Sequence, residues 1–204
     1  EALKYYQQAL SIRREVQDRS GEAVTLNSIG IVYQEMSQLQ EALRYYKQAL
    51  AITQEIRDRN SEGNSLNNIG AVYRDIGKPQ EALTYYQQAL PIWREVSDRS
   101  GEATTLNNIG VVYSDIGEPQ QALKYFQQAL PVFREVRDRR GEAGTLHNMG
   151  EVYSDIGEPQ QALKYFQQAL SISREVSDHI REAETLVNIG AVYRDIGQLQ
   201  ETLK

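Results

Sequence analysis

The chain has 204 residues, of which 40% are hydrophobic and 25% charged, a balance typical of a folded protein. A net charge of -6 and a pI near 5.1 provide no basic surface for nucleic acid or anionic lipid, so we expect neither nucleic acid nor a membrane as partner. The sequence has no cysteine, no apolar run long enough to span a membrane and no signal peptide, and these features predict a cytoplasmic protein without disulfides.

The sequence repeats with a period of 40 residues. One motif recurs as LNSIGIVYQEM, LNNIGAVYRDI, LNNIGVVYSDI, LHNMGEVYSDI and LVNIGAVYRDI, starting at Leu26, Leu66, Leu106, Leu146 and Leu186. We therefore expect a single repeat array over residues 1–204. In chain order its parts are the second helix of an incomplete repeat at 1–20, full repeats at 21–60, 61–100, 101–140 and 141–180, and an incomplete repeat at 181–204.

The copy at 61–100 predicts a helical hairpin. Apolar residues recur at helical spacing from Leu66 to Ile76. Gly77 and Pro79 then indicate the end of one helix and the start of the next, which is expected to run from about Gln80 to Ser97. Strands are improbable at this periodicity, so the expected fold is all-α.

Two local features qualify these helices. The segment after Ser97 interrupts the pattern, and Ser100 is the expected N-cap of the following helix. Pro91 and Pro131 lie well inside second helices, where each removes a backbone hydrogen bond and is expected to kink the helix. We favour tolerated local strain over a change of superhelical curvature as the meaning of these prolines.

A glycine recurs in the middle of each first helix, where it costs about 1 kcal/mol relative to alanine. Its five copies are Gly30, Gly70, Gly110, Gly150 and Gly190. They share a side with the Leu and Tyr positions, so we expect that the first helix approaches the second closely there, opposite Ala82 or Ala122. A Gly110→Ala change is expected to overpack this contact.

The recurring positions resemble the tetratricopeptide repeat (TPR) pattern W-x2-L-G-x2-Y…A-x3-F, here Leu66, Ile69, Gly70, Tyr73, Ala82, Tyr86 and Ala89. The array is similar to the 40-residue type of TPR found in kinesin light chains, Pins-like adaptors and bacterial signalling proteins. It departs from the pattern because Leu replaces Trp, Tyr replaces Phe except at Phe126 and Phe166, and no proline closes the second helix. The resemblance implies an α-solenoid of helix-turn-helix repeats that forms a right-handed superhelix with the first helices on its concave side.

The resemblance also implies a peptide-binding groove on the first helices. The position from which TPR proteins hold a peptide backbone is occupied by Asn68, Asn108, Asn148 and Asn188, with Ser28 in the first copy. The expected groove is completed by Asn64, Asn67, Arg74, Asn107, His147, Glu151 and Arg194. Hydrogen bonds between repeats, or solvation, would explain the recurring asparagines equally well. A free carboxyl terminus is a poor candidate ligand, because positions 67, 107, 147 and 187 carry no Lys or Arg.

Other chemistry has little support in the sequence. An acidic row at the ends of the first helices could attract a basic partner, although pairing with nearby arginines is the favoured interpretation: Asp75, Asp115, Asp155 and Asp195. His147 and His179 are the only histidines and form no HExxH motif, and the sequence has neither a Walker loop nor GxSxG. We therefore expect no metal, no cofactor and no enzymatic activity.

The two ends of the array are expected to be adhesive. The helix that starts at Ala2 carries Leu3, Tyr6, Leu10 and Val16 without the first helix that should cover them. We expect that the chain is a piece of a longer array, and that in isolation this helix of one molecule docks on residues 181–196 of another.

The leading hypothesis is a protein-protein interaction scaffold that binds an extended or helical peptide segment in its concave groove. A structural spacer or self-assembling array of consensus-like copies is the first alternative. A sensor region of a larger signalling enzyme is the second.

Overall fold

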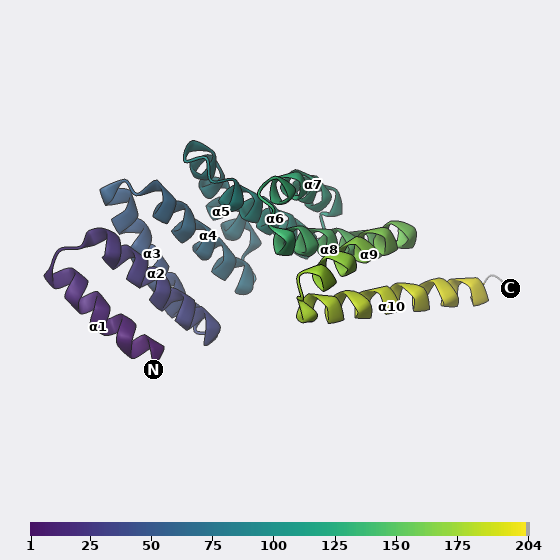
Figure 1. Ribbon diagram of the computed structural model, residues 1–204, viewed down its shortest axis with the longest axis horizontal. Helices are drawn as coiled ribbons and strands as arrows, with labels where there is room; N and C mark the ends of the chain where they lie inside the picture. The colour runs from purple at the N-terminus through teal and green to yellow at the C-terminus, as the bar shows by residue number, and fades with distance from the viewer. Residues whose placement is uncertain (203–204) are drawn as a thin grey trace. The chain divides into compact units, whose positions relative to one another are not determined.

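The computed structural model describes the backbone of residues 1–202 and the side chains of residues 1–197; over the described backbone the chain forms ten α-helices and no strand (Figure 1). The expected all-α fold of paired helices is confirmed. The helices fall into two compact units, Glu1–Gly101 and Glu102–Lys204, which are described separately. The right-handed superhelix stays a prediction.

Unit 1 contains α1 (Ala2–Glu15), α2 (Arg19–Glu35), α3 (Leu39–Ile56), α4 (Arg59–Asp75) and α5 (Pro79–Glu95). Each helix packs on the next in the chain, and the first helices α2 and α4 also contact each other. Its core consists of small and large apolar residues that alternate between facing helices, such as Ala42 and Tyr46 on α3 with Ile69 and Val72 on α4.

Unit 2 contains most of α6 (Arg99–Asp115), followed by α7 (Pro119–Glu135), α8 (Arg139–Asp155), α9 (Pro159–Glu175) and α10 (His179–Thr202). α7 packs on α8, α8 on α9 and α9 on α10, while the first helices α8 and α10 contact each other. α5 and α7 continue through Pro91 and Pro131 as single helices.

The N-termini of the first helices correct one expectation, the identity of the capping residue. Asp98 Oδ1 accepts a hydrogen bond from the Gly101 backbone N–H at 2.8 Å, and Ser100 lies inside α6. The equivalent carboxylates cap the other first helices of internal repeats: Asp18, Asp58 and Asp138. Aspartate, not Ser100, therefore provides the cap, because its carboxylate reaches the third backbone N–H of a helix that starts earlier than expected.

The last helix also differs from expectation. Gly77, Gly117 and Gly157 adopt φ values of 72° to 76° and end their first helices, as the sequence indicated. Gly197 stands at the equivalent position of the last copy, but no such turn forms there, and α10 continues to Thr202.

The glycines in the first helices are confirmed as points of close approach, but the contacting group is an aromatic ring. A Cβ added at Gly70 would lie 2.7 Å from Tyr86 Cε1, and all three nearest atoms belong to that ring. At Gly110 the nearest atom is Phe126 Cε1, at 2.6 Å. The expected partners Ala82 and Ala122 are wrong because a ring extends much farther from its helix axis than a methyl group.

Gly190 is the exception among these glycines. Among the residues that the structure describes, nothing lies within 4 Å of a Cβ added at this position of α10. The equivalent contact in the preceding repeat is made by Phe166 on α9, which packs on Gly150 of α8.

Tyrosines at the end of each hairpin stack on each other. The rings of Tyr73 on α4 and Tyr85 on α5 lie 5.3 Å apart between centroids. The same stacking occurs in the other complete hairpins: Tyr33 with Tyr45, Tyr113 with Tyr125, and Tyr153 with Tyr165. These pairs explain why the tyrosine recurs although its ring is only partly buried.

Buried glutamates join successive helices through arginines. Glu142 in the first turn of α8 is 4% exposed and accepts from Arg134 Nε of α7 at 2.7 Å and from Arg139 of its own helix. Arg139 Nη2 also bonds Glu175 Oε2 at the end of α9, at 2.6 Å. Glu142 and Arg139 together therefore connect the end of α7, the start of α8 and the end of α9. The same network recurs around Glu22.

These ion pairs predict a loss of stability in acid. Burial raises the pKa of Glu22, but hydrogen bonds from Arg14 and Arg19 outweigh it, so the pKa lies below the ordinary value of 4.5. A hydrogen bond from Arg139 lowers the pKa of Glu175 in the same way. Because these carboxylates bind protons less readily in the folded state, their stabilisation is complete above about pH 5 and is lost as the pH falls through the lowered pKa.

We therefore expect the midpoint of thermal unfolding, followed by circular dichroism, to decrease as the pH falls from about 5 to about 3. A Glu22→Gln variant, which lacks one of these carboxylates, is expected to show a smaller decrease. A midpoint that stays constant or rises over this range would contradict the assigned role of the ion pairs.

Candidate peptide-binding site

The predicted groove residues lie on the first helices, and in unit 2 several of them bond to the neighbouring first helix. Asn107 Oδ1 of α6 accepts from Thr145 Oγ1 at 3.1 Å and from Asn148 Nδ2 at 3.3 Å. In unit 1 the Asn27 amide and the Ser65 hydroxyl make the equivalent contact between α2 and α4, at 2.9 Å. These amides therefore connect repeats, which was the alternative explanation for their recurrence.

His147 connects α8 to α10. It is 3% exposed, and its Nδ1 lies 2.8 Å from Thr185 Oγ1. The Thr185 hydroxyl already donates to the Arg181 carbonyl oxygen, so Nδ1 is the donor in this contact. Asn188 Nδ2 approaches His147 Nε2 at 3.4 Å and donates to Glu151 Oε1 at 3.2 Å. Burial of His147 leaves Glu151 and Asn188 as the accessible members of this group.

The other predicted residues lie nearer the solvent. Asn64 is exposed, while Asn67, Asn68 and Asn108 are half-buried. Both predicted arginines pair with the acidic row: Arg74 with Asp75 at 3.2 Å, and Arg194 with Asp195 at 3.1 Å.

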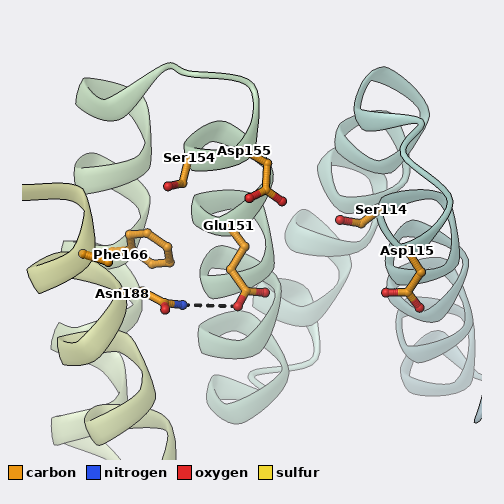
Figure 2. Close-up of a pocket in the computed structure, with 8 residues that line it drawn as sticks. Ser114, Asp115, Glu151, Ser154, Asp155, Phe166 and Asn188 are labelled. Atoms are coloured by element: carbon orange, nitrogen blue, oxygen red, sulfur yellow. Dashed lines mark hydrogen bonds between the residues drawn. The ribbon is translucent and has the colours of Figure 1, made fainter. Parts of the chain in front are cut away.

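A pocket of about 350 Å³ opens on the first helices of unit 2 (Figure 2). We call it the acidic pocket. Its lining includes Ser114 and Asp115 of α6, Glu151, Ser154 and Asp155 of α8, Phe166 of α9, and Asn188 of α10. Figure 2 shows that these side chains come from separate helices and that the Asn188 amide bonds Glu151 at the edge of the group. Two of the predicted groove residues, Glu151 and Asn188, thus line an actual recess.

The acidic pocket exists because of two linked residue choices. In unit 1, Gln34 of α2 accepts from the buried Tyr46 hydroxyl at 3.0 Å and donates to Asp75 at 3.0 Å. In unit 2, Phe166 has no hydroxyl to satisfy, and the short side chain of Ser154 stands at the position equivalent to Gln34. A recess remains where unit 1 has a glutamine side chain.

Our sequence reasoning missed Ser154 and Phe166, although the signal was present. The two copies with Tyr on the second helix carry Gln34 or Arg74 on the first, while the two copies with Phe carry Ser114 or Ser154. A tyrosine hydroxyl on the second helix thus goes with a long polar side chain on the first, and a phenylalanine goes with a serine. This correlation was the available signal.

The electrostatics of the acidic pocket favour a cationic group. The interaction with the neighbouring His147 imidazole lowers the pKa of Glu151 and outweighs the opposing effect of burial. Burial and the nearby charge of Glu151 raise the pKa of Asp155. Of the described residues, no group of three His, Cys, Asp or Glu side chains is arranged to hold a metal ion. No described helix combines the length and apolar character needed to cross a membrane.

Comparison with known proteins establishes the family. The tetratricopeptide repeat family model matches residues 1–55, 61–135 and 141–203, so the chain belongs to the TPR family. Among curated protein sequences, none matches the chain significantly.

Solved structures share the fold at low sequence identity. BtubC from P. vanneervenii is 20% identical with a TM-score of 0.83, over 98% of this chain and 84% of that one. A putative kinesin light chain from Podospora anserina with nearly identical TPR-like repeats is 21% identical with a TM-score of 0.71, over 90% of each chain. The Rap conjugation gene regulator of plasmid pLS20, in complex with the Phr* peptide, is 19% identical with a TM-score of 0.77, over 90% of this chain and 51% of that one.

Proposed function

We propose that this TPR chain is a protein-protein interaction module that holds an extended or helical segment of a partner protein on its first helices. The acidic pocket carries the proposal, because it offers a recess of about 350 Å³ beside polar groups that can bond a peptide main chain. The likeness to a Rap regulator solved with a peptide is consistent with this use of the fold.

The chemistry of the acidic pocket suggests which peptides it would accept. Asp115, Glu151 and Asp155 line it together, so a Lys or Arg side chain would gain charge-assisted hydrogen bonds there. We therefore propose a partner segment that carries at least one basic residue.

Selection from a random peptide library displayed on phage tests the function. Enriched peptides should bind the 204-residue chain in solution, measured by fluorescence anisotropy, and should be rich in Lys and Arg. Binding should weaken in the triple variant Asn68→Ala, Asn108→Ala, Asn148→Ala, and should persist in a control in which exposed amides of the second helices are removed: Gln87→Ala, Gln127→Ala and Gln167→Ala. Failure to enrich any peptide would favour the structural-spacer alternative.

Filling the acidic pocket is a sharper test. Ser154→Arg places a long cation at the position equivalent to Arg74, where it can pair with Asp155 as Arg74 pairs with Asp75. The fold should therefore tolerate it, and the affinity for selected basic peptides should fall about tenfold or more, or about 1.4 kcal/mol. Gln87→Arg on the exposed side of α5 adds the same charge away from the pocket and should leave the affinity nearly unchanged. Equal affinities of the two variants would remove the pocket from the proposal.

A further inference from the structure

We infer that the acidic pocket selects arginine over lysine in the partner segment, because both oxygens of Asp155 are placed to accept from one guanidinium group. This selectivity rests on the proposed function, since it names the basic residue that the acidic pocket would hold. The equivalent carboxylate of unit 1, Asp75, stands 80 residues earlier in the chain and has its donors within the protein.

In unit 1 each oxygen of this carboxylate receives its own N–H donor. Asp75 Oδ2 accepts from Gln34 Nε2 of α2 at 3.0 Å. Asp75 Oδ1 accepts from Nη2 of Arg74, the preceding residue of α4, at 3.2 Å. The two donors come from two different side chains, one on each of two neighbouring first helices.

In unit 2 serines replace both of these donors. Ser114 of α6 stands at the position of Gln34, and Ser154 of α8 stands at the position of Arg74. Among the described residues, none forms a hydrogen bond or an ion pair with Asp155. Both of its oxygens are therefore available to a ligand.

The space that the shorter side chains leave gives access to Asp155. This residue lines the acidic pocket, and it also lines a second recess of about 190 Å³ beside Val152 and Ile156. Ser114 lines both spaces as well. Figure 2 shows the Asp155 side chain on the side of α8 that faces Ser114 of α6. The carboxylate thus lies where the two recesses meet.

Two available oxygens on one carboxylate suit a guanidinium better than an ammonium group. Arginine presents paired N–H groups in a rigid planar fork that can bond both oxygens of a carboxylate, whereas lysine acts as a point charge. One guanidinium would therefore replace both donors of unit 1. Burial and the nearby charge of Glu151 raise the pKa of Asp155, and a bound cation would offset the repulsion between these two carboxylates.

An exchange of arginine for lysine in a selected peptide tests the inference. Peptides enriched against the 204-residue chain should carry arginine at one fixed position. Lysine at that position should lower the affinity, measured by fluorescence anisotropy, about tenfold, which is the contribution of one hydrogen bond to a charged group. Asp155→Asn should bind both peptides equally and weakly, because an amide offers only one acceptor oxygen. Asp155 is exposed and unpaired, so this variant should fold as the wild type does.

Asp75→Asn is the matched control in unit 1. It should keep the preference for arginine, since Gln34 and Arg74 already occupy the oxygens of Asp75.

A second variant supplies the missing donor from within the chain. Ser114→Gln places an amide where Gln34 stands in unit 1, so it should bond Asp155, lower the affinity for the arginine peptide and abolish the preference over lysine. Ser171→Gln, on the exposed side of α9, adds the same side chain away from the acidic pocket and should change neither.

The outcomes separate this inference from the proposed function. Peptides that bind the wild type equally well with lysine, or a preference for arginine that persists in Asp155→Asn or Ser114→Gln, would overturn the inference and leave the proposed function standing. If no peptide binds the wild type, the proposed function fails and the inference fails with it.

Discussion

Replacing Gly150 with alanine is expected to lower the free energy of unfolding by about 1 to 3 kcal/mol, although alanine is the better helix former. The new Cβ would lie 2.6 Å from Phe166 Cδ1 and 3.0 Å from Phe166 Cγ, distances at which one of the two must move. Phe166 is 1% exposed, so its ring has no solvent into which to turn. The helices would have to separate, and the packing loss exceeds the roughly 1 kcal/mol gained in helix propensity.

Gly144→Ala in the same helix is the control for this prediction. No described atom lies within 4 Å of its added Cβ, so the propensity gain should appear alone and raise stability by up to about 1 kcal/mol. Urea unfolding followed by circular dichroism measures both changes. The double variant Gly150→Ala, Phe166→Leu should lose less stability than the sum of the losses in the two single variants, because the smaller side chain makes room for the methyl group. A stabilised Gly150→Ala protein would refute close approach as the reason for the glycine.

Replacing Glu142 with alanine is expected to cost about 1.5 to 3 kcal/mol, the range for hydrogen bonds to a charged group. The carboxylate is buried and accepts from guanidinium groups on two helices, Arg134 of α7 and Arg139 of α8. Both arginines are more than a third exposed, so their guanidinium groups can be solvated when the carboxylate is removed. The cost therefore stays below that of leaving a buried charge unpaired.

Glu175→Ala removes the outer carboxylate of the same network and serves as the control. Glu175 is 59% exposed, so its removal should change the urea midpoint much less than removal of Glu142. Glu142→Gln keeps the shape and one acceptor oxygen. Its urea midpoint should therefore lie between those of the wild type and Glu142→Ala. Equal midpoints for Glu142→Ala and Glu175→Ala would show that the burial of Glu142 adds nothing.

The candidate site shows where sequence reasoning stopped. Groove residues could be placed on first helices because helical periodicity fixes which positions share a face. Periodicity could not show which of these side chains form hydrogen bonds with other repeats. The bond from Thr145 to Asn107 joins residues 38 apart, and that from Asn188 to Glu151 joins residues 37 apart. Such pairs depend on how successive hairpins stack.

The sequence by itself determined the 40-residue repeat, the helical hairpins and the glycine at each close contact, because these follow from local periodicity, turn residues and backbone sterics. Only the tertiary structure decided that rings rather than alanines cover those glycines, that His147 is buried, and that Ser154 and Phe166 leave a recess. It also decided that Gly197 continues a helix. Side-chain reach and contacts between repeats set these outcomes, and neither can be read from local periodicity.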